Sequence, residues 1–218
     1  MAAIKILLLL GVLVISGCAS MRVAGQVQSG RQALLAGEPE RALAYFQEAA
    51  SGDANYIYQA GASGLFRQSV WTYLGRAQYR LGMLQSARQS LERALSVYDN
   101  DYLARMYLGL TLARLGNPSE SSTEIQTGMK GLYDWLEHME YSRPFEASWD
   151  PGREIRSEIE KNLAMISGKD IDWDELIASG EWLGTRIEEE VEYVRRDERR
   201  RRDRRLRPGV SLGVGVGF

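Results

Sequence analysis

A 34-residue period restricts the fold of this 218-residue chain more than any other feature of its sequence. Gly82 and Gly116 are 34 positions apart, and the pairs Leu74-Gly75 and Leu108-Gly109 repeat at the same distance. Self-similarity at a fixed period of about 20–50 residues is typical of solenoids, in which each repeat is one supersecondary unit. Glycine ends helices readily, so Gly82 and Gly116 are expected to close the first helix of a unit. The period therefore predicts a fold of repeated units in which these glycines end helices.

The residues within this period resemble the tetratricopeptide repeat, a family of helical hairpins. The central copy, about 68–101, carries Trp71, Leu74-Gly75, Gly82, Ala87, Leu91 and Ala94-Leu95. Weaker copies span about 102–135 and 23–56, and an insertion at 57–67 separates the first copy from the second. The resemblance implies an all-α fold, an α-solenoid of about three hairpins over residues 23–141. Residues 132–141 are expected to cap the stack. Capping and extended helices are expected to follow over 142–206, one opening at Asp150-Pro151 and one starting at Asp172 with a pause at Gly180, and residues 207–218 form a tail.

The resemblance also implies a concave groove made by the first helix of each hairpin, where a protein partner would bind. Its lining would be Gln28, Arg31, Thr72, Tyr73, Arg76, Tyr79, Arg80, Met106, Tyr107 and Arg114. Thr72 and Arg76 stand where repeats that grip a peptide carboxylate carry Lys and Asn. Tyr and Arg are frequent binding hot spots. The alternative is that these are solvated groups on a helix surface.

The N-terminus predicts export. Lys5 precedes the apolar run 6–15, which is too short for a bilayer core that needs about twenty residues. The segment Ile15-Ser16-Gly17-Cys18 resembles the lipobox of bacterial lipoproteins, which implies removal of residues 1–17 and lipidation (palmitate) of Cys18, with 18–22 as a linker. Ala19 favours the outer membrane, with the protein facing the periplasm. The alternative is an ordinary signal peptide with a chance cysteine.

Catalytic motifs are scarce, so we expect no enzyme, no cofactor and no metal site. His138 is the only histidine, and the only cysteine is assigned to the lipid. Zinc sites and Cys–His or Ser–His–Asp systems therefore lack their components. Asp170, Asp172 and Asp174 have part of a calcium-loop spacing, but Glu175 stands where that loop needs glycine. Helix capping by Asp172 and Glu175 explains the same acids.

A basic arm lies near the C-terminus. Its arginines are Arg195, Arg196, Arg199, Arg200, Arg201, Arg202, Arg204, Arg205 and Arg207. Against Asp197, Glu198 and Asp203 they leave +6 (nine minus three), while the rest of the mature chain carries −9. The whole chain has a net charge of −2, and loss of Lys5 leaves −3 for the mature chain, from which the arm's +6 is subtracted. Export argues against a nucleic-acid partner. The candidates are anionic lipid, cell-wall polymer, an acidic protein face, or a solvated helix end.

The tail alternates apolar and small residues from Val210 to Phe218. It is expected either to be disordered or to add as a strand to an exposed sheet edge of a partner. Together these features predict a membrane-anchored periplasmic adaptor or assembly factor for an envelope complex, with an unidentified protein partner. The alternative is a lipoprotein that binds an envelope polymer or anionic lipid through its basic arm.

Overall fold

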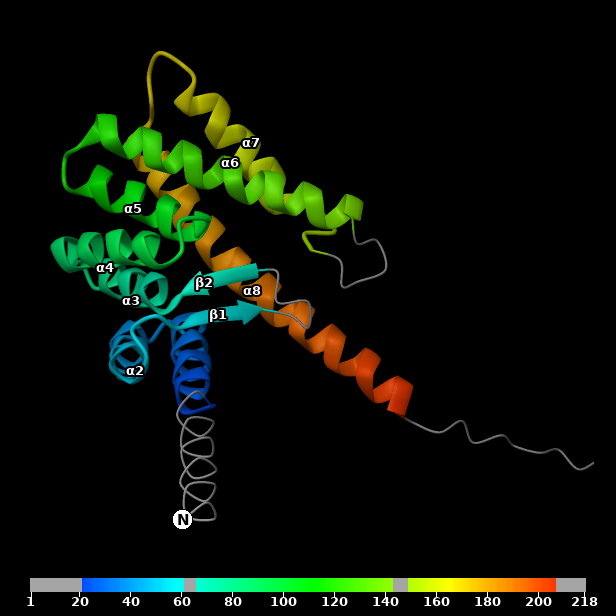
Figure 1. The fold of residues 1–218 in the computed structure, drawn as a ribbon. Helices are drawn as coiled ribbons and strands as arrows, with labels where there is room; N and C mark the ends of the chain where they lie inside the picture. The colour runs from blue at the N-terminus through cyan, green and yellow to red at the C-terminus, as the bar shows by residue number, and fades with distance from the viewer. Residues whose placement is uncertain (1–20, 61–65, 143–148, 207–218) are drawn as a thin grey trace, which may run out of the picture.

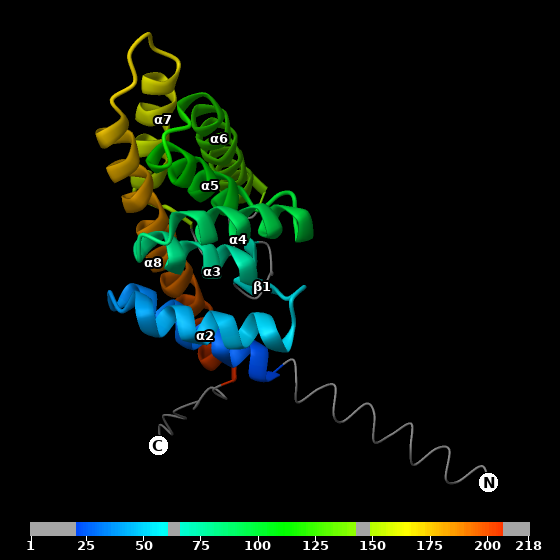
Figure 2. The ribbon, with the colours of Figure 1, turned by 90° about the vertical axis from the view of Figure 1, so that its left-hand side faces the viewer.

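The computed structural model describes residues 21–60, 66–142 and 149–206. Three consecutive helical hairpins build most of this region (Figures 1 and 2). The first pairs a helix over residues 21–35 with α2 (Pro39–Gly52). The second pairs α3 (Val70–Arg80) with α4 (Leu84–Val97), and the third pairs α5 (Tyr102–Arg114) with α6 (Pro118–Ser142).

Each hairpin turns at a glycine with a left-handed backbone. Gly37, Gly82 and Gly116 have φ values of 75°, 73° and 83°, which glycine adopts without the steric cost of a Cβ atom. In the second hairpin Gly82 N donates to Tyr79 O, and Met83 N donates to Gln78 O. The other two turns repeat this hydrogen-bond pattern, a Schellman arrangement that satisfies carbonyls at a helix end. The expected helix-ending role of Gly82 and Gly116 is therefore confirmed.

A second glycine in each hairpin lets its two helices approach closely. A Cβ atom on Gly75 would lie 2.6 Å from Leu91 Cγ. The equivalent distance would be 2.4 Å between Gly30 and Phe46, and 2.5 Å between Gly109 and Ile125. In all three hairpins the large residue follows its glycine by 16 positions (46 − 30, 91 − 75 and 125 − 109). The same sequence spacing thus produces the same interlocking contact three times.

The inserted segment between the first two hairpins contains a small antiparallel sheet. Strand β1 (Ile57–Ala60) pairs with β2 (Phe66–Ser69), with Ile57 opposite Ser69. The Ser69 side chain then accepts a hydrogen bond from Trp71 N and caps α3. Asp101 binds the same junction, because its carboxylate accepts from Ser69 N, Thr72 Oγ1 and Ala104 N. One buried carboxylate therefore joins β2, α3 and α5.

The last two helices are α7 (Glu154–Ile166) and α8 (Trp173–Leu206). Figure 1 shows α8 running from the α5–α7 end across all three hairpins and projecting beyond the β-strands. The mostly helical architecture confirms the predicted all-α fold, to which the two-stranded sheet is a small addition.

Three helix boundaries differ from the sequence predictions. Residues 132–141, expected as a separate capping helix, continue α6 without a break. Helix α7 starts at Glu154 and not at Pro151, because Asp150 has a φ of 49° and its carboxylate accepts from Ile155 N and Arg156 N. The pause expected at Gly180 is absent from α8, because close packing against Leu110 favours a glycine within the helix.

Candidate functional site

The expected groove is filled by α8. Seven of its ten residues are buried, with exposed fractions of 3% or less: Arg31, Thr72, Tyr73, Arg76, Tyr79, Met106 and Tyr107. Gln28 is half-buried, and only Arg80 and Arg114 are exposed. The expectation of solvent-exposed side chains lining an open groove was therefore wrong. Helix α8, the last helix in the described part of the chain, lies where a partner was expected.

Glu188 of α8 occupies the centre of this face. Its carboxylate accepts from Arg31 Nε at 2.8 Å and forms a second ion pair with Arg76 Nη1. Arg31 also donates through Nη1 to Tyr58 Oη at 2.7 Å and to Glu192 at 3.0 Å. One carboxylate thus connects the first hairpin to the second through α8.

Electrostatics keep this cluster charged. Burial acts to raise the pKa of Glu188, but the guanidinium groups of Arg31 and Arg76 outweigh it and hold that pKa below its ordinary value. Burial acts to lower the pKa of each arginine, but Glu188 and the surrounding tyrosines, joined by Glu192 at Arg31, together outweigh it, so both pKa values are raised. The three side chains therefore remain ionised together, and removing any one would leave an uncompensated charge in the interior.

Other groove residues contact α8 along its length. Arg76 Nη2 donates to Gly184 O at 2.9 Å, Tyr79 Oη donates to Glu181, and Arg80 Nη2 donates to Thr185 Oγ1. Gln28 Nε2 donates to Glu192 at 3.3 Å. These bonds follow the order of the hairpins, with the first hairpin contacting the later residues of α8.

Three predicted groove residues serve the hairpins themselves. Thr72 donates to Asp101, and Tyr73 stacks on Phe46 with ring centroids 5.3 Å apart. Met106 is buried in α5 where Gly128 of α6 approaches its backbone. Arg114 lies at the edge of the face, with its guanidinium 4.8 Å from the ring centroid of Tyr79. These contacts make the residues structural.

Two glycines let α8 approach the stack. A Cβ atom on Gly184 would lie 2.1 Å from Tyr107 Oη, and one on Gly180 would lie 2.7 Å from Leu110 Cδ2. The same side of the helix buries five aliphatic side chains almost completely: Leu176, Leu183, Ile187, Val191 and Val194. Full burial of such a side chain contributes about 1.5–3 kcal/mol. Their sum is comparable to the net stability of a whole domain, so α8 belongs to the folded core.

The sequence of α8 has the pattern of a helix with a buried face. Leu176, Gly180, Leu183, Ile187 and Val191 recur every three or four residues, which is the spacing of a buried helix face. Glu188 lies beside this apolar stripe, so its carboxylate is expected to be buried. A buried carboxylate needs a cationic partner. The stripe therefore indicates a buried face with an acid at its edge, but it does not indicate that Arg31 and Arg76 are the partners of that acid.

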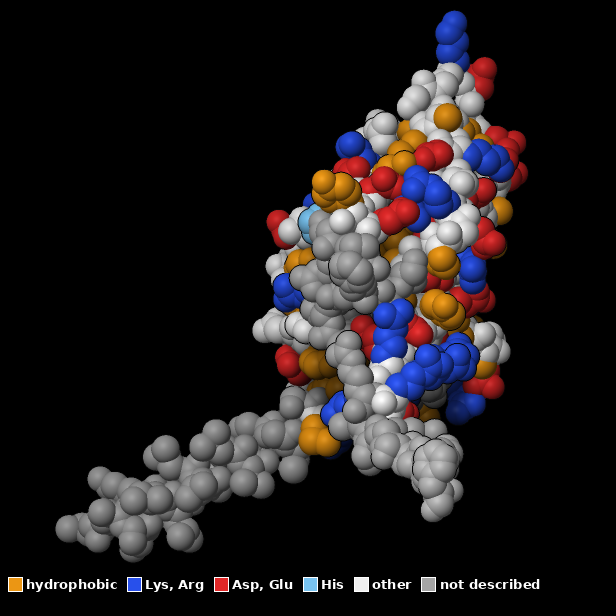
Figure 3. Space-filling model, turned by 90° about the vertical axis from the view of Figure 1, so that its right-hand side faces the viewer, with side chains coloured by type: hydrophobic (Ala, Val, Ile, Leu, Met, Phe, Trp, Pro, Cys, Tyr) orange, Lys and Arg blue, Asp and Glu red, His pale blue; other side chains and the backbone are white. Residues whose placement is uncertain are grey.

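The basic arm begins where α8 leaves the hairpins. Arg195 is half-buried and pairs with Glu192 and Gln28. The arginines at 196, 199, 200, 201, 202 and 204 are exposed, and Arg201 pairs with Asp197. Cys18, Arg207 and the tail 207–218 lie outside the described residues, as does the side chain of Arg205. Figure 3 shows Lys and Arg side chains gathered on the lower part of the face onto which α8 emerges.

No protein-family model matches the chain, and no curated protein has a significant sequence match to it. Over the described ranges 21–60, 66–142 and 149–206, no helix is both long and apolar enough to cross a membrane. The same residues contain no group of three or more His, Cys, Asp or Glu side chains placed to hold a metal ion. Asp172 caps α8 by accepting from Glu175 N at 3.0 Å, and His138 is exposed on α6.

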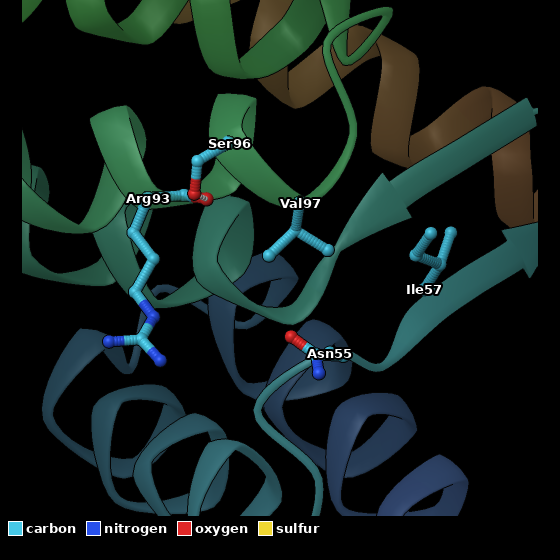
Figure 4. A pocket seen from close by; sticks show the side chains of 5 residues that line it. All are labelled: Asn55, Ile57, Arg93, Ser96 and Val97. Atoms are coloured by element: carbon cyan, nitrogen blue, oxygen red, sulfur yellow. Dashed lines mark hydrogen bonds between the residues drawn. The ribbon is translucent and has the colours of Figure 1, made fainter.

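An open hollow of about 530 Å³ lies between α4 and the segment that leads into β1. Asn55, Ile57, Arg93, Ser96 and Val97 line it. Figure 4 shows these side chains spread around the hollow without converging on one point. The guanidinium of Arg93 lies 4.4 Å from the ring centroid of Trp71. This lining has no acid–base pair and no nucleophile with a base beside it, so it does not form a catalytic constellation.

Proposed function

We propose that this chain is a lipid-anchored adaptor of the bacterial cell envelope, held at the outer membrane and facing the periplasm. The lipobox-like segment ending at Cys18 supports the anchor. The three hairpins with equivalent glycine contacts support the resemblance to tetratricopeptide repeats. Such repeats serve many unrelated complexes, so the resemblance alone does not identify a partner.

The observation that carries this proposal is the path of α8. The helix is packed into the concave face as far as Val194 and then projects from the hairpins (Figure 1). A partner entering the groove would have to displace a buried ion cluster and five buried aliphatic side chains. We therefore assign partner binding to the C-terminal end and propose that the hairpins serve as a rigid mount for it.

The proposed contact is strand addition by Val210 to Phe218. Alternating apolar residues would enter pockets on one face of a partner's sheet, and backbone hydrogen bonds would supply affinity. This segment follows α8 in the chain, and α8 ends beyond the hairpins (Figure 1). The partner is then a periplasmic or membrane-associated protein with an exposed sheet edge.

Site-specific photocrosslinking in living cells tests this assignment. A photoreactive residue at Val210 or Val214 is expected to capture one defined partner, whereas one at Arg80, an exposed groove residue, should not. A peptide covering residues 208–218 should compete for that partner. The same peptide with proline at positions 212 and 214 should not compete, because proline removes amide donors from the ladder. Capture from Arg80 alone would refute the proposal and restore the groove as the binding site.

The anchor has its own test. Cys18→Ser is expected to abolish incorporation of labelled palmitate and to release the protein from membranes. Ser16→Ala leaves a small residue before the cysteine and is the matched control. A Cys18→Ser variant that remained membrane-bound at unchanged mass would disprove lipidation.

The second candidate function is binding of an anionic envelope component through the basic arm. The exposure of Arg199, Arg200 and Arg202 favours it, since these guanidinium groups can reach an external ligand. It is compatible with the adaptor function, because the arm and the tail are separate segments. Charge-driven binding would weaken steeply with salt, since attraction between exposed charges is screened beyond about 8 Å at physiological ionic strength.

A further inference from the structure

We infer that the exposed end of α8 and the start of the N-terminal helix form one membrane-facing surface that binds anionic lipid headgroups. The inference rests on the proposed lipid anchor for its orientation. It names the ligand of the basic arm, for which the sequence left lipid, polymer and protein open.

The first argument is the direction of two helices. Gln28 contacts Glu192 and Arg195 of α8. Arg31 lies about one turn after Gln28 in the first helix, and it contacts Glu188, which lies about one turn before Glu192 in α8. The helix over 21–35 and α8 therefore cross with opposite chain directions. As a result, the beginning of the first and the end of the second leave their contact toward the same side. Figures 1 and 2 agree, since both ends lie at the lower end of the molecule.

The second argument is reach. Cys18 is three residues before Met21, so an extended link spans at most about 11 Å. Met21 precedes Gln28 by seven residues, or about 10 Å of helix, and α8 continues eleven residues beyond Arg195, or about 16 Å. The anchor thus lies at most about 21 Å beyond Gln28, so the described end of the arm comes within about 5 Å of its level. The bilayer that holds the anchor is then the nearest extended surface to the arm.

The third argument is charge and composition. The arm carries +6 and the rest of the mature chain −9, so an anionic surface attracts this end and repels the remainder. Met21 is 77% exposed and Tyr193 is 53% exposed, which adds apolar and aromatic side chains on the same two helices. Tyrosine and arginine are well suited to the membrane interface, where an apolar body and a polar tip meet different surroundings. Together these features match a lipid surface better than a polymer alone.

The test uses the mature chain without its lipid, residues 19–218, which retains every described residue. Cosedimentation is measured with vesicles of phosphatidylcholine alone and with vesicles containing phosphatidylglycerol. The test variant carries Arg199→Gln, Arg200→Gln and Arg202→Gln. The matched control carries Arg41→Gln, Arg88→Gln and Lys130→Gln, which removes the same charge from exposed sites on α2, α4 and α6.

The expected result is binding to the anionic vesicles only, weakened at least about tenfold by the arm substitutions and unchanged by the control. Binding should also fall steeply as salt is raised. Failure to bind anionic vesicles, or equal loss in both variants, would overturn the inference. Binding to isolated cell-wall polymer but not to vesicles would assign the arm to the polymer instead. Because this protein carries no lipid, the result is independent of palmitate labelling at Cys18 and of peptide competition for the tail.

Discussion

Glu188→Ala tests whether the ion cluster fixes α8 in the groove. The substitution removes the carboxylate between Arg31 and Arg76, whose exposed fractions are 0% and 3%, and leaves two guanidinium groups buried. Breaking a buried ion pair on one side costs about 3–5 kcal/mol. For a chain of this size each kcal/mol lowers the melting temperature by about 2–4 °C, so a decrease of about 6–20 °C is expected.

In the assay, residues 19–218 are unfolded by heat and by urea, and circular dichroism reports the loss of helix. Glu189→Ala is the matched control, because the neighbouring side chain is half exposed and pairs only with Arg186 in the described part of the chain. It should change the free energy of unfolding by less than about 0.5 kcal/mol. A triple variant with methionine at Arg31, Arg76 and Glu188 should recover much of the loss, since it removes all three buried charges. A cost below about 1 kcal/mol for Glu188→Ala would refute the reasoning, because the cluster would then be open to water.

Two further predictions concern the hairpins. Gly75→Ala should lower the free energy of unfolding by about 1–3 kcal/mol, because the added Cβ atom overpacks against Leu91. The control is Gly25→Ala, which should raise the free energy of unfolding by up to about 1 kcal/mol, because no atom lies within 4 Å of its added Cβ atom. Equal shifts of the two urea midpoints would contradict the close contact between Gly75 and Leu91. Burial raises the pKa of Asp101 to about 6 despite three hydrogen bonds. The folded state then binds more protons than the unfolded state between about pH 4 and 6, so this carboxyl lowers stability as the pH rises through that window. Asp101→Asn should flatten the plot of urea midpoint against pH between about pH 4 and 6. An unchanged slope would show that other groups cause the pH dependence.

Sequence patterns recovered the hairpins because their determinants are local. Gly82 and Gly116 must adopt a positive φ, and Gly75 must lie against Leu91, so each requirement is visible within one repeat. The position of α8 could not be obtained in this way. It depends on pairing Glu188 with Arg31 across 157 residues, and a period within one helix gives no information about the partner of its buried face.

The same limit applies to the candidate site. Tyr and Arg residues of the first helices were expected to bind a protein partner, whereas Arg31, Arg76 and Tyr79 bind α8 of the same chain. The β-strands at 57–60 and 66–69 were also missed, since the strands are four residues each and the segment has no regular alternation. In both cases contacts between segments far apart in the sequence determine the structure.

The closure of the groove by α8 has a consequence for the timing of folding. Repeat stacks held only by neighbouring units can fold progressively along the chain. Here Arg31 and Arg76 are not neutralised until residue 188 has arrived, so the first hairpins cannot reach their final stability while the C-terminal part is still being synthesised or translocated. If the chain is exported with its N-terminus first, as proposed, its hairpins would therefore remain loosely packed during passage until α8 emerges. The long separation between these contacts predicts slow, cooperative folding that is completed only once α8 is present.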